Sequence, residues 1–462
     1  MRTAAVATAA GPGVTVVRAD GDPALRAGYA ALRRRAFVEE QGLFPSHDSD
    51  DHDSGPATRV LCAVGPGGDV VGGVRLDPEG GDPALGWWRG SRLVCTSAPG
   101  PTRGLIGAAL VREACIQALD AGALRFDAHV QERHAGFFAR LGWQEVRTVE
   151  VAGRPHRLMR WPVDRMERLA HATKAALGPL LAEVLATPAG FLGDDASPVP
   201  GSALVASTDA ILPSMVAADP EWAGWCGMLV TAHDLSAMGA RPAAALDALG
   251  ARDEAHAASV LAGLRDGAQA LDLPLIGGHT TLGVSPALSV TGLGHAESPV
   301  PAGGAAAGDE LRVTADLGGD WRPGYGQTQW DSSTRRTRDE LRTMLDAVGR
   351  ARPRAAKDVS MAGIAGTTGM LAEACGCGAE LDVAAIPRPE GARAGDWLTC
   401  FPGFAMVTAD RPDAPPLPAG AATGAACGRL TGEPGVRLRW PDGETTTAVS
   451  GPVTRLGAAS QE

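Results

Sequence analysis

The sequence lacks the signatures of several protein classes. It has no long basic run and a formal net charge of −11, so the electrostatic footprint of a nucleic-acid-binding protein is missing. No stretch of about 18 uncharged apolar residues occurs, and the N-terminal residues contain no sustained apolar segment typical of a signal peptide. The eight cysteines include no CxxC pair, which argues against a zinc knuckle or a disulfide scaffold. We therefore expect a cytoplasmic protein that binds neither membranes nor nucleic acid.

Two further shortages concern nucleotide chemistry. The signature GxxxxGK[ST] is absent, which excludes a standard P-loop. Only two of the 42 basic residues are lysines, Lys174 and Lys357, because arginine has replaced lysine almost everywhere. A lysine retained in such a chain is a candidate functional residue, and Lys357 lies in a Gly-rich context.

The length of 462 residues predicts two or three folding units. Hydrophobic residues make up 45% of the chain, so real cores can form. Helix and strand patterns alternate throughout, which predicts a mixed α/β (α+β) fold. We place domain boundaries at 1–163, 164–304 and 305–462.

The first of these segments carries a series of short motifs in a characteristic order. They are "RAFVEEQGLF", the acidic run "HDSDDHD", "VVGGVRL", "SRLV", the turn "PTRGLIGAAL" and "QERHAGFFARLGW". Free backbone N–H groups in the first turn of a helix can hold a phosphate. In this order the motifs resemble the Gcn5-related N-acetyltransferase (GNAT) family over about residues 14–150.

The resemblance implies a GNAT-like acyltransferase fold that uses acetyl-CoA or another acyl-CoA. Arg103, Gly104 and Gly107 would then hold the pyrophosphate of coenzyme A, and the backbone of Leu93, Val94 and Cys95 would pair with the pantetheine arm. The spacing of the Gly-rich turn is irregular, because Leu105 stands where the family has a glycine.

The residues for proton transfer in this segment remain open. Where many relatives carry a tyrosine that protonates the leaving thiolate, this chain has Phe138, which has no proton to donate. A base for the amine could come from the acidic run or from a strand histidine. The candidates are Glu39, Glu40, Asp48, Asp50, Asp53 and His129, each of which has an ordinary structural alternative as a solvated or hydrogen-bonded side chain.

The second half supplies oxygen ligands from several separated segments, as Mg²⁺ shared with ATP phosphates requires. These are Asp194 and Asp195 in "GDDA", Asp209 in "STDA" and Asp234 in "HDLSAMGA". We interpret "GGHTT" at 277–281 as a polar Gly turn. Each acid alone is more often a turn or cap residue than a ligand, but together they predict a Mg²⁺–ATP site.

The ordered set "LGDDA", "ALVASTDAILP", "LVTAHDLSAMGARP", "LIGGHTTLG" and "GDELRVTADLG" resembles the aminoimidazole ribonucleotide (AIR) synthase-like superfamily over about residues 165–455. Its members include thiamine monophosphate kinase, selenide water dikinase and a hydrogenase maturation protein. The resemblance implies two α/β subdomains, a homodimer formed through the first of them, and metal ligation by the four aspartates. It also implies nucleotide contacts from Gly193, Thr208, Gly278, His279, Thr280 and Thr281.

The segment "AKDVSMAGIAGTTGM" matches the place where the superfamily has a short acidic motif before a Gly turn and a helix. We therefore count Lys357 and Asp358 as catalytic candidates. The fusion order also resembles proteins of a nitrogen-starvation and nitrilase-associated gene cluster.

The combined reading is a bifunctional enzyme for a small nitrogenous metabolite. The first domain would acylate an amine, and the second would phosphorylate an amide oxygen for cyclisation, amidine or nitrile formation. The alternative is a kinase similar to thiamine monophosphate kinase, with a regulatory, non-catalytic domain that binds acyl-CoA.

Overall fold

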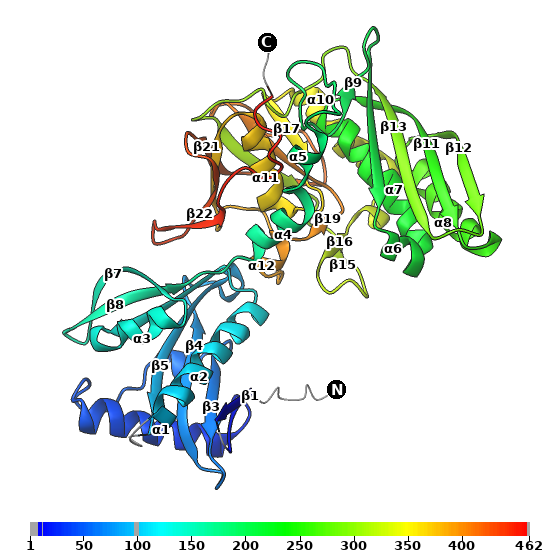
Figure 1. Ribbon diagram of the computed structural model, residues 1–462. Coiled ribbons are helices and arrows are strands. Elements are labelled where there is room, and N and C mark those ends of the chain that lie inside the picture. Colours follow the sequence, from blue (N-terminus) through cyan, green and yellow to red (C-terminus); the bar gives the residue numbers. More distant parts are fainter. Residues whose placement is uncertain (1–7, 12, 97–100, 460–462) are drawn as a thin grey trace. The chain divides into compact units, whose positions relative to one another are not determined.

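The computed structural model describes residues 8–11, 13–96 and 101–459 (Figure 1). It divides into two compact units. The first comprises residues 1–163 with 393–395, and the second comprises 164–392 with 396–462. Within the described residues, no helix combines the length and apolar character that crossing a membrane requires.

The first unit is built on one eight-stranded sheet with the order β1-β2-β3-β4-β5-β6-β8-β7. Its strands are β1 (Thr8–Gly11), β2 (Val14–Arg18), β3 (Arg59–Val64), β4 (Val70–Pro78), β5 (Trp87–Cys95), β6 (Arg125–Gln131), β7 (Gln144–Val151) and β8 (Arg154–Trp161). The helices are α1 (Pro23–Arg33), α2 (Pro101–Asp120) and α3 (Ala135–Arg140), with short helical turns η1 (Arg34–Glu40), η2 (Asp51–Ser54), η3 (Pro83–Leu85) and η4 (Glu132–His134).

Helices cover both faces of this sheet. Alternate residues of a strand point to opposite faces, and β3 follows this rule: Leu61 and Ala63 pack in the core beneath α2, whereas Val60 and Cys62 pack in the core beneath α1. The two helices therefore lie on opposite faces. Helix α2 begins at Pro101, five residues before the apolar run starting at Ile106 that predicts it.

The second unit begins with helices α4 (Arg165–Lys174) and α5 (Leu177–Leu181) and continues into a five-stranded sheet. The sheet has the order β12-β11-β13-β10-β9. Its strands are β9 (Ser197–Pro198), β10 (Leu204–Ile211), β11 (Arg241–Ala251), β12 (Leu275–Leu282) and β13 (Ala287–His295). Helices α6 (Pro213–Ala218), α7 (Pro220–Ala237) and α8 (Glu254–Ala270) accompany it, and α7 and α8 pack against one face (Figure 1).

Two glycines let α7 and α8 approach closely. A Cβ at Gly224 would lie 2.2 Å from the carbonyl oxygen of Val260, and one at Gly263 would lie 1.9 Å from that of Glu221. Side chains at either position would push the helices apart. This close packing holds α7, which carries Asp234, firmly against the sheet.

The rest of the second unit is a seven-stranded sheet with the order β17-β20-β14-β21-β18-β22-β23. Its strands are β14 (Glu310–Ala315), β17 (Ala355–Asp358), β18 (Gly378–Asp382), β20 (Ala405–Asp410), β21 (Thr423–Thr431), β22 (Gly435–Arg439) and β23 (Thr445–Val449). A small sheet contains β15 (Asp320–Trp321), β16 (Gln329–Asp331) and β19 (Phe401–Pro402). The helices are α9 (Arg338–Leu345), α10 (Ala347–Ala351) and α11 (Gly363–Ala374), with the turn η5 (Ser333–Arg335). The short helix α12 (Ala394–Trp397) begins within residues 393–395 of the first unit and ends in the second.

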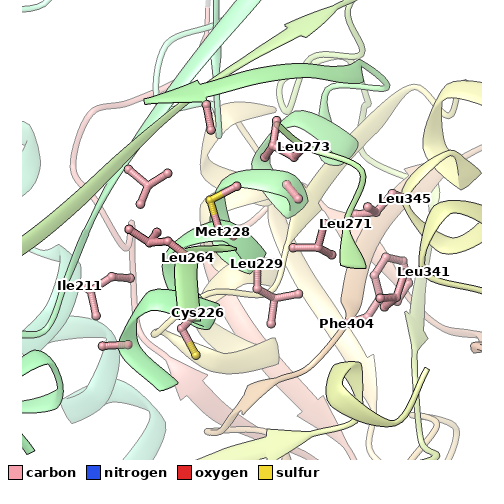
Figure 2. Close-up of a cluster of buried hydrophobic side chains, with 14 of the residues drawn as sticks. Ile211, Cys226, Met228, Leu229, Leu264, Leu271, Leu273, Leu341, Leu345 and Phe404 are labelled. Atoms are coloured by element: carbon pink, nitrogen blue, oxygen red, sulfur yellow. The ribbon is translucent and has the colours of Figure 1, made fainter. Parts of the chain in front are cut away.

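One hydrophobic core joins the two sheets of the second unit. It contains Leu229 of α7, Leu264 of α8, Leu341 of α9 and Phe404 next to β20, all nearly inaccessible to solvent (Figure 2). Because a packed interior resists deformation, this core fixes the position of α7 relative to β17. Residues from both sheets can therefore form one site.

Candidate functional site

Three carboxylates of the second unit converge. One oxygen each of Asp195, Asp234 and Asp358 lies within 4.8 Å of the others. They come from the loop before β9, from helix α7 and from the end of strand β17. Segments far apart in the sequence thus bring oxygen ligands of the kind that Mg²⁺ prefers into one place.

Asp209 lies next to this group, on β10. Its Oδ2 is buried and accepts no hydrogen bond from the described residues, and its charge contributes to the raised pKa of Asp234. Burial raises the pKa of Asp234 well above the usual range, and the carboxylates of Asp209, Asp358 and Asp195 raise it further. Burial and the charge of Asp195 act on the pKa of Asp358 in the same direction.

These shifts have one physical meaning. Buried like charges disfavour one another, so their ionised forms are costly without a counter-charge. A divalent cation among the carboxylates would supply that charge, and the orphaned oxygen of Asp209 would supply a further ligand. The donor set therefore fits Mg²⁺.

Among the described residues, Lys357 places a positive charge in direct contact with the cluster. Its Nζ donates to Asp195 Oδ1 at 2.5 Å and to the carbonyl oxygen of Gly193 at 3.1 Å. Burial alone would lower the pKa of Lys357, but the carboxylates of Asp195 and Asp194 outweigh it and raise the pKa. Lys357 is therefore a protonated ammonium, and it is 3% exposed.

Asp194 and Asp195 have different surroundings although they are adjacent. Asp194 accepts the backbone N–H of Ala302 at 2.7 Å through Oδ2 and that of Asp195 at 3.0 Å through Oδ1. Burial raises the pKa of Asp194 to about 7. Both carboxylate oxygens of Asp194 thus hold backbone in place, whereas Asp195 belongs to the converging group.

The residues of "GGHTT" lie elsewhere, and their predicted turn is wrong. Gly278, His279, Thr280 and Thr281 belong to β12, the edge strand of the five-stranded sheet. Gly278 is aligned with Asp209 through β11 and β13, which separates them by three strand spacings of about 4.8 Å each. Strand pairing within the chain leaves no loop here, because this segment continues the parallel ladder with β11.

Thr208 also lies apart from the carboxylates. Its Oγ1 is 2.8 Å from Oγ1 of Thr291 on β13. Since Thr208 precedes Asp209 on the same strand, its side chain points to the opposite face of the sheet. Within one copy of the chain, Thr208 and the β12 residues are therefore not part of the carboxylate site.

Sequence reasoning missed one neighbour of the site. Lys174, at the end of α4, is close enough to lower the pKa of Asp358 by its charge. The scarcity of lysine was a usable signal for Lys174, because both lysines of the chain act on this cluster.

The first unit contains a cavity of about 660 Å³ where β5 and β6 separate. These two strands pair in parallel only as far as Gly90 and Ala128. Beyond that point β5 has a bulge, and Arg92 adopts a left-handed backbone with φ 56°. The diverging strands leave backbone edges on β5 and β6 that do not pair with each other.

The residues predicted to bind coenzyme A line this cavity in part. Leu93, Val94 and Cys95 form the separated end of β5, and Gly104 and Gly107 of α2 also contribute. Gly104 lies in the first turn of α2 and Gly107 in the second. The side chain of Arg103 and the preceding residues 97–100 lie outside the described residues.

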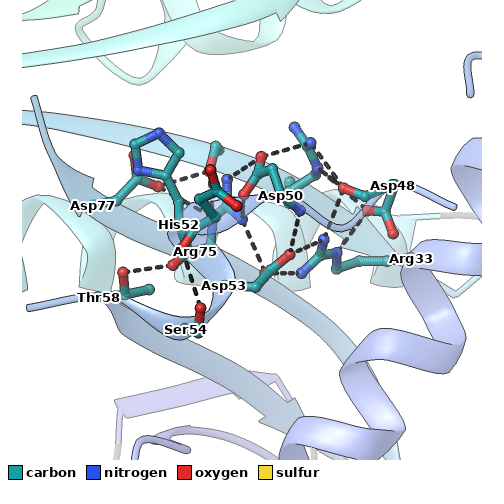
Figure 3. A network of polar contacts seen from close by, with 12 residues as sticks. Arg33, Asp48, Asp50, His52, Asp53, Ser54, Thr58, Arg75 and Asp77 are labelled. Carbon is teal, nitrogen blue, oxygen red and sulfur yellow. Dashed lines mark hydrogen bonds and ion pairs between the residues drawn. The ribbon is translucent and has the colours of Figure 1, made fainter. Parts of the chain in front are cut away.

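Asp48 and Asp50 are held in an ion-pair network with arginines (Figure 3). Asp48 accepts from Arg33 Nε at 2.7 Å, and Asp50 accepts from Arg75 Nη1 at 2.5 Å and from Arg92 Nη2 at 2.9 Å. Burial would raise the pKa of Asp50, but the hydrogen bond and charge of Arg75 lower it overall. Asp50 is thereby held as an anion between two arginines.

His129 has a different environment. It lines the cavity on β6, and burial, with the charge of Arg89, lowers its pKa to about 4. The imidazole is therefore neutral at pH 7 and able to accept a proton. Phe138 is buried and packs edge-on against Trp143, with 5.3 Å between the ring centroids.

Residues 193–296 match the model "AIR synthase related protein, N-terminal domain", and residues 298–440 match "AIR synthase related protein, C-terminal domain". The chain belongs to the AIR synthase related family. The predicted two-subdomain α/β architecture of the second half is thereby confirmed. The matched segments begin at residue 193, so the acetyltransferase-like fold of the first unit stays a prediction.

Two curated relatives carry no described activity. The chain is 36% identical over 228 residues to the uncharacterized protein sll0787 of Synechocystis, covering 48% of this chain and 70% of that protein. It is 30% identical over 197 residues to the uncharacterized protein MJ0640 of Methanocaldococcus jannaschii, covering 40% of this chain and 59% of that protein.

Among the solved structures that match, one with a TM-score of 0.50 supports the same fold. T. maritima PurL complexed with ADP matches with a TM-score of 0.50 at 14% identity, over 64% of this chain and 52% of that chain. Thiamine monophosphate kinase from Aquifex aeolicus matches with a TM-score of 0.44 at 19% identity, over 58% of this chain and 96% of that chain. At these identities the likeness concerns the fold and not the reaction.

Proposed function

We propose that the second unit uses Mg²⁺–ATP to phosphorylate an amide oxygen of a small nitrogenous metabolite. The observation that carries the proposal is the convergence of Asp195, Asp234 and Asp358 beside the unpartnered oxygen of Asp209. Phosphoryl transfer depends on positioning and on stabilising charge, and a divalent ion bound to carboxylates supplies both. Membership of the AIR synthase related family and the likeness in fold to T. maritima PurL, which was solved in complex with ADP, agree with this assignment.

In the proposed site, each residue has a separate task. Asp195, Asp209, Asp234 and Asp358 would hold Mg²⁺, while Asp194 fixes the loop that presents Asp195. Lys357 and Lys174 would offset the negative charge of phosphate groups on the substrate side. Phosphorylation makes the amide oxygen a leaving group, so attack by an internal nitrogen would close a ring or form an amidine, and elimination would form a nitrile.

The test is turnover of the purified full-length chain with Mg²⁺–ATP and candidate amides. We expect release of ADP and free phosphate only with the true substrate, together with a product that has lost water. Asp209→Asn and Asp234→Asn should each reduce this release roughly 100- to 1000-fold. Unchanged turnover in both variants would show that the metal assignment is wrong.

A small-molecule kinase is the second candidate for this unit. It is favoured by the same carboxylate cluster, since both reactions begin with phosphoryl transfer. The two differ in the product: a kinase leaves a stable phosphorylated molecule, whereas the activating enzyme releases free phosphate. Mass spectrometry of the product distinguishes them.

We further propose that two copies pair through the five-stranded sheet. The face opposite α7 and α8 carries exposed Thr208, Ala210 and Ala248, and all residues of β12 from Ile276 to Leu282 are exposed. An uncovered sheet edge of this kind is normally paired or shielded. The resemblance to the superfamily implies that such pairing builds the nucleotide cleft, which would bring the β12 residues into it. Sedimentation of the purified chain should show a dimer, and Leu246→Glu should weaken it.

For the first unit we propose acyl transfer from an acyl-CoA to an amine. The separated strands β5 and β6 support it, because strand edges that do not pair with each other leave space between them for an extended amide-bearing ligand such as pantetheine. His129 would take the proton of the amine. Because Phe138 has no proton to donate, water would protonate the thiolate. Coenzyme A should bind with measurable affinity in a titration; a complete lack of binding would contradict the proposal.

A further inference from the structure

The cavity of the first unit has two sides with different chemistry. On β6, Phe126, Ala128 and Val130 face the core beneath α2, whereas His129 and Gln131 alternate with them and face the α1 side. The α1 side is mixed: the polar Arg75, Arg92 and Asp50 line it together with apolar side chains such as Leu32, Phe37 and Phe44. The α2 side is the more uniformly apolar of the two. Because β5 and β6 separate, one cavity reaches both faces of the sheet.

The α2 side forms what we call the apolar chamber. It is lined by Val111, Ala114, Ala128, Val130, Phe138 and Trp143. Among these side chains, only the indole N–H of Trp143 is polar, and each of them is also part of the core beneath α2. A polar acyl acceptor would lose its hydrogen bonds to water in such surroundings.

The acyl end of a thioester fits this chamber better than the acceptor does. An acetyl group presents one methyl to it, while a longer chain would cover several of these side chains. At 660 Å³, the whole cavity is in the size range of pockets that enclose drug-sized ligands. The cavity therefore has room for a pantetheine arm together with an acyl chain.

We propose that the first unit selects an acyl-CoA of medium chain length, whose hydrocarbon tail occupies the apolar chamber. This inference rests on the proposed acyl-CoA function of the same unit. In the reaction, the amine nitrogen bonds to the thioester carbonyl carbon, the carbon–sulfur bond breaks, and coenzyme A leaves as the thiolate. His129 takes the proton of the amine, and water protonates the thiolate.

The chain-length series on the full-length protein is the first test. Calorimetric titrations with free coenzyme A and with acetyl-, butyryl-, hexanoyl- and octanoyl-CoA measure the affinity of each. Each buried methylene strengthens binding about fourfold, so burial of only two of the six methylenes that octanoyl-CoA adds to acetyl-CoA gives roughly 16-fold tighter binding. We therefore expect octanoyl-CoA to bind at least tenfold more tightly than acetyl-CoA. Equal affinities along the series would overturn the inference alone, whereas no binding of any member would overturn the acyl-CoA function as well.

A variant inside the chamber is the second test. Ala114→Phe fills the space on α2 and should reduce the affinity for octanoyl-CoA at least tenfold while leaving acetyl-CoA binding nearly unchanged. Ile116→Phe, at a position on the same helix that is 48% exposed, is the matched control and should change neither. If the phenylalanine side chain unfolds the unit, Ala114→Val is a smaller substitution at the same position. Retained binding of acetyl-CoA shows that each variant is folded.

The result that contradicts the chamber assignment is equally definite. If Ala114→Phe and Ile116→Phe both keep the wild-type preference for octanoyl-CoA over acetyl-CoA, the acyl tail binds elsewhere on the protein. Suppose that Ala114→Val and Ala114→Phe both bind acetyl-CoA normally and both still prefer octanoyl-CoA as strongly as the wild type does. The apolar chamber then does not hold the acyl tail.

Discussion

The two units treat buried carboxylates in opposite ways. In the first unit, Arg33, Arg75 and Arg92 bind Asp48, Asp50 and Asp53 so that each acid has a basic partner. In the second, Asp195, Asp234, Asp358 and Asp209 share one contacting ammonium group, that of Lys357. Carboxylates that are paired with arginines stabilise the fold, whereas a group of carboxylates with excess negative charge is suited to bind a cation.

Removing a basic partner in the first unit should have the largest effect on stability. Arg75 is 1% exposed and binds Asp50 and Asp77, so Arg75→Met leaves buried charge without compensation. We expect a loss of about 3–5 kcal/mol in the free energy of unfolding of this unit. Urea unfolding measures it, with Arg265→Met, on the exposed surface of α8, as the control. A loss below about 1 kcal/mol would show that the network contributes little.

Removing an acid from the second unit should affect activity and spare stability. Asp234→Asn relieves repulsion among the carboxylates but deletes a ligand, so turnover of ATP should fall roughly 100- to 1000-fold. The thermal midpoint should stay the same or rise. ADP release measures the turnover, and a melting curve measures the thermal midpoint. A lower midpoint with normal turnover would show that Asp234 stabilises the fold and does not serve the reaction.

Ligand binding should stabilise the second unit alone. With Mg²⁺ and a non-hydrolysable ATP analogue at about 100 times the dissociation constant, linkage predicts roughly 2.7 kcal/mol of added stability. Calorimetry of the wild type should show a higher melting temperature for the transition of the second unit and an unchanged one for the transition of the first unit. Asp358→Asn should lose the shift, and chelation of the metal should abolish it in the wild type.

The smallest effect concerns pH and the first unit. Burial lowers the pKa of His129 to about 4, below its value of about 6.5 in an unfolded chain. As the pH falls from about 6.5 toward 4, the unfolded chain binds a proton at this histidine and the folded chain does not. The free energy of unfolding is therefore independent of this group above about pH 6.5 and decreases between about pH 6.5 and pH 4. The rate of acyl transfer should likewise stay level down to about pH 5, and His129→Gln should remove the acidic limb. An acidic limb centred near pH 6.5 would show that another group is the base.

The order of short motifs predicted that acids from several segments come together, and Asp195, Asp234 and Asp358 do converge in the structure. Their role as metal ligands stays a prediction. The pair Asp194 and Asp195 shows what the sequence left open. Their hydrogen bonds depend on Ala302 and Lys357, more than 100 positions away, so local composition could not tell which acid faces the cluster.

Other differences have local causes. "GGHTT" has the composition of a turn, but tertiary pairing with β11 makes it a strand, since a ladder partner can outweigh local preference. Asp48 and Asp50 were equal candidates for a base until the arginines of α1, β4 and β5 were placed beside them. Long-range ion pairs of this kind have no periodic signal in a sequence.

The bond from Lys357 to Asp195 has a consequence for the order of binding. A free divalent ion approaching Asp195 meets an ammonium group that already holds one of its oxygens. The polyphosphate of ATP offsets both positive charges, so metal and nucleotide should favour each other's entry. We therefore expect strong positive cooperativity between Mg²⁺ and ATP, and weak retention of either one without the other.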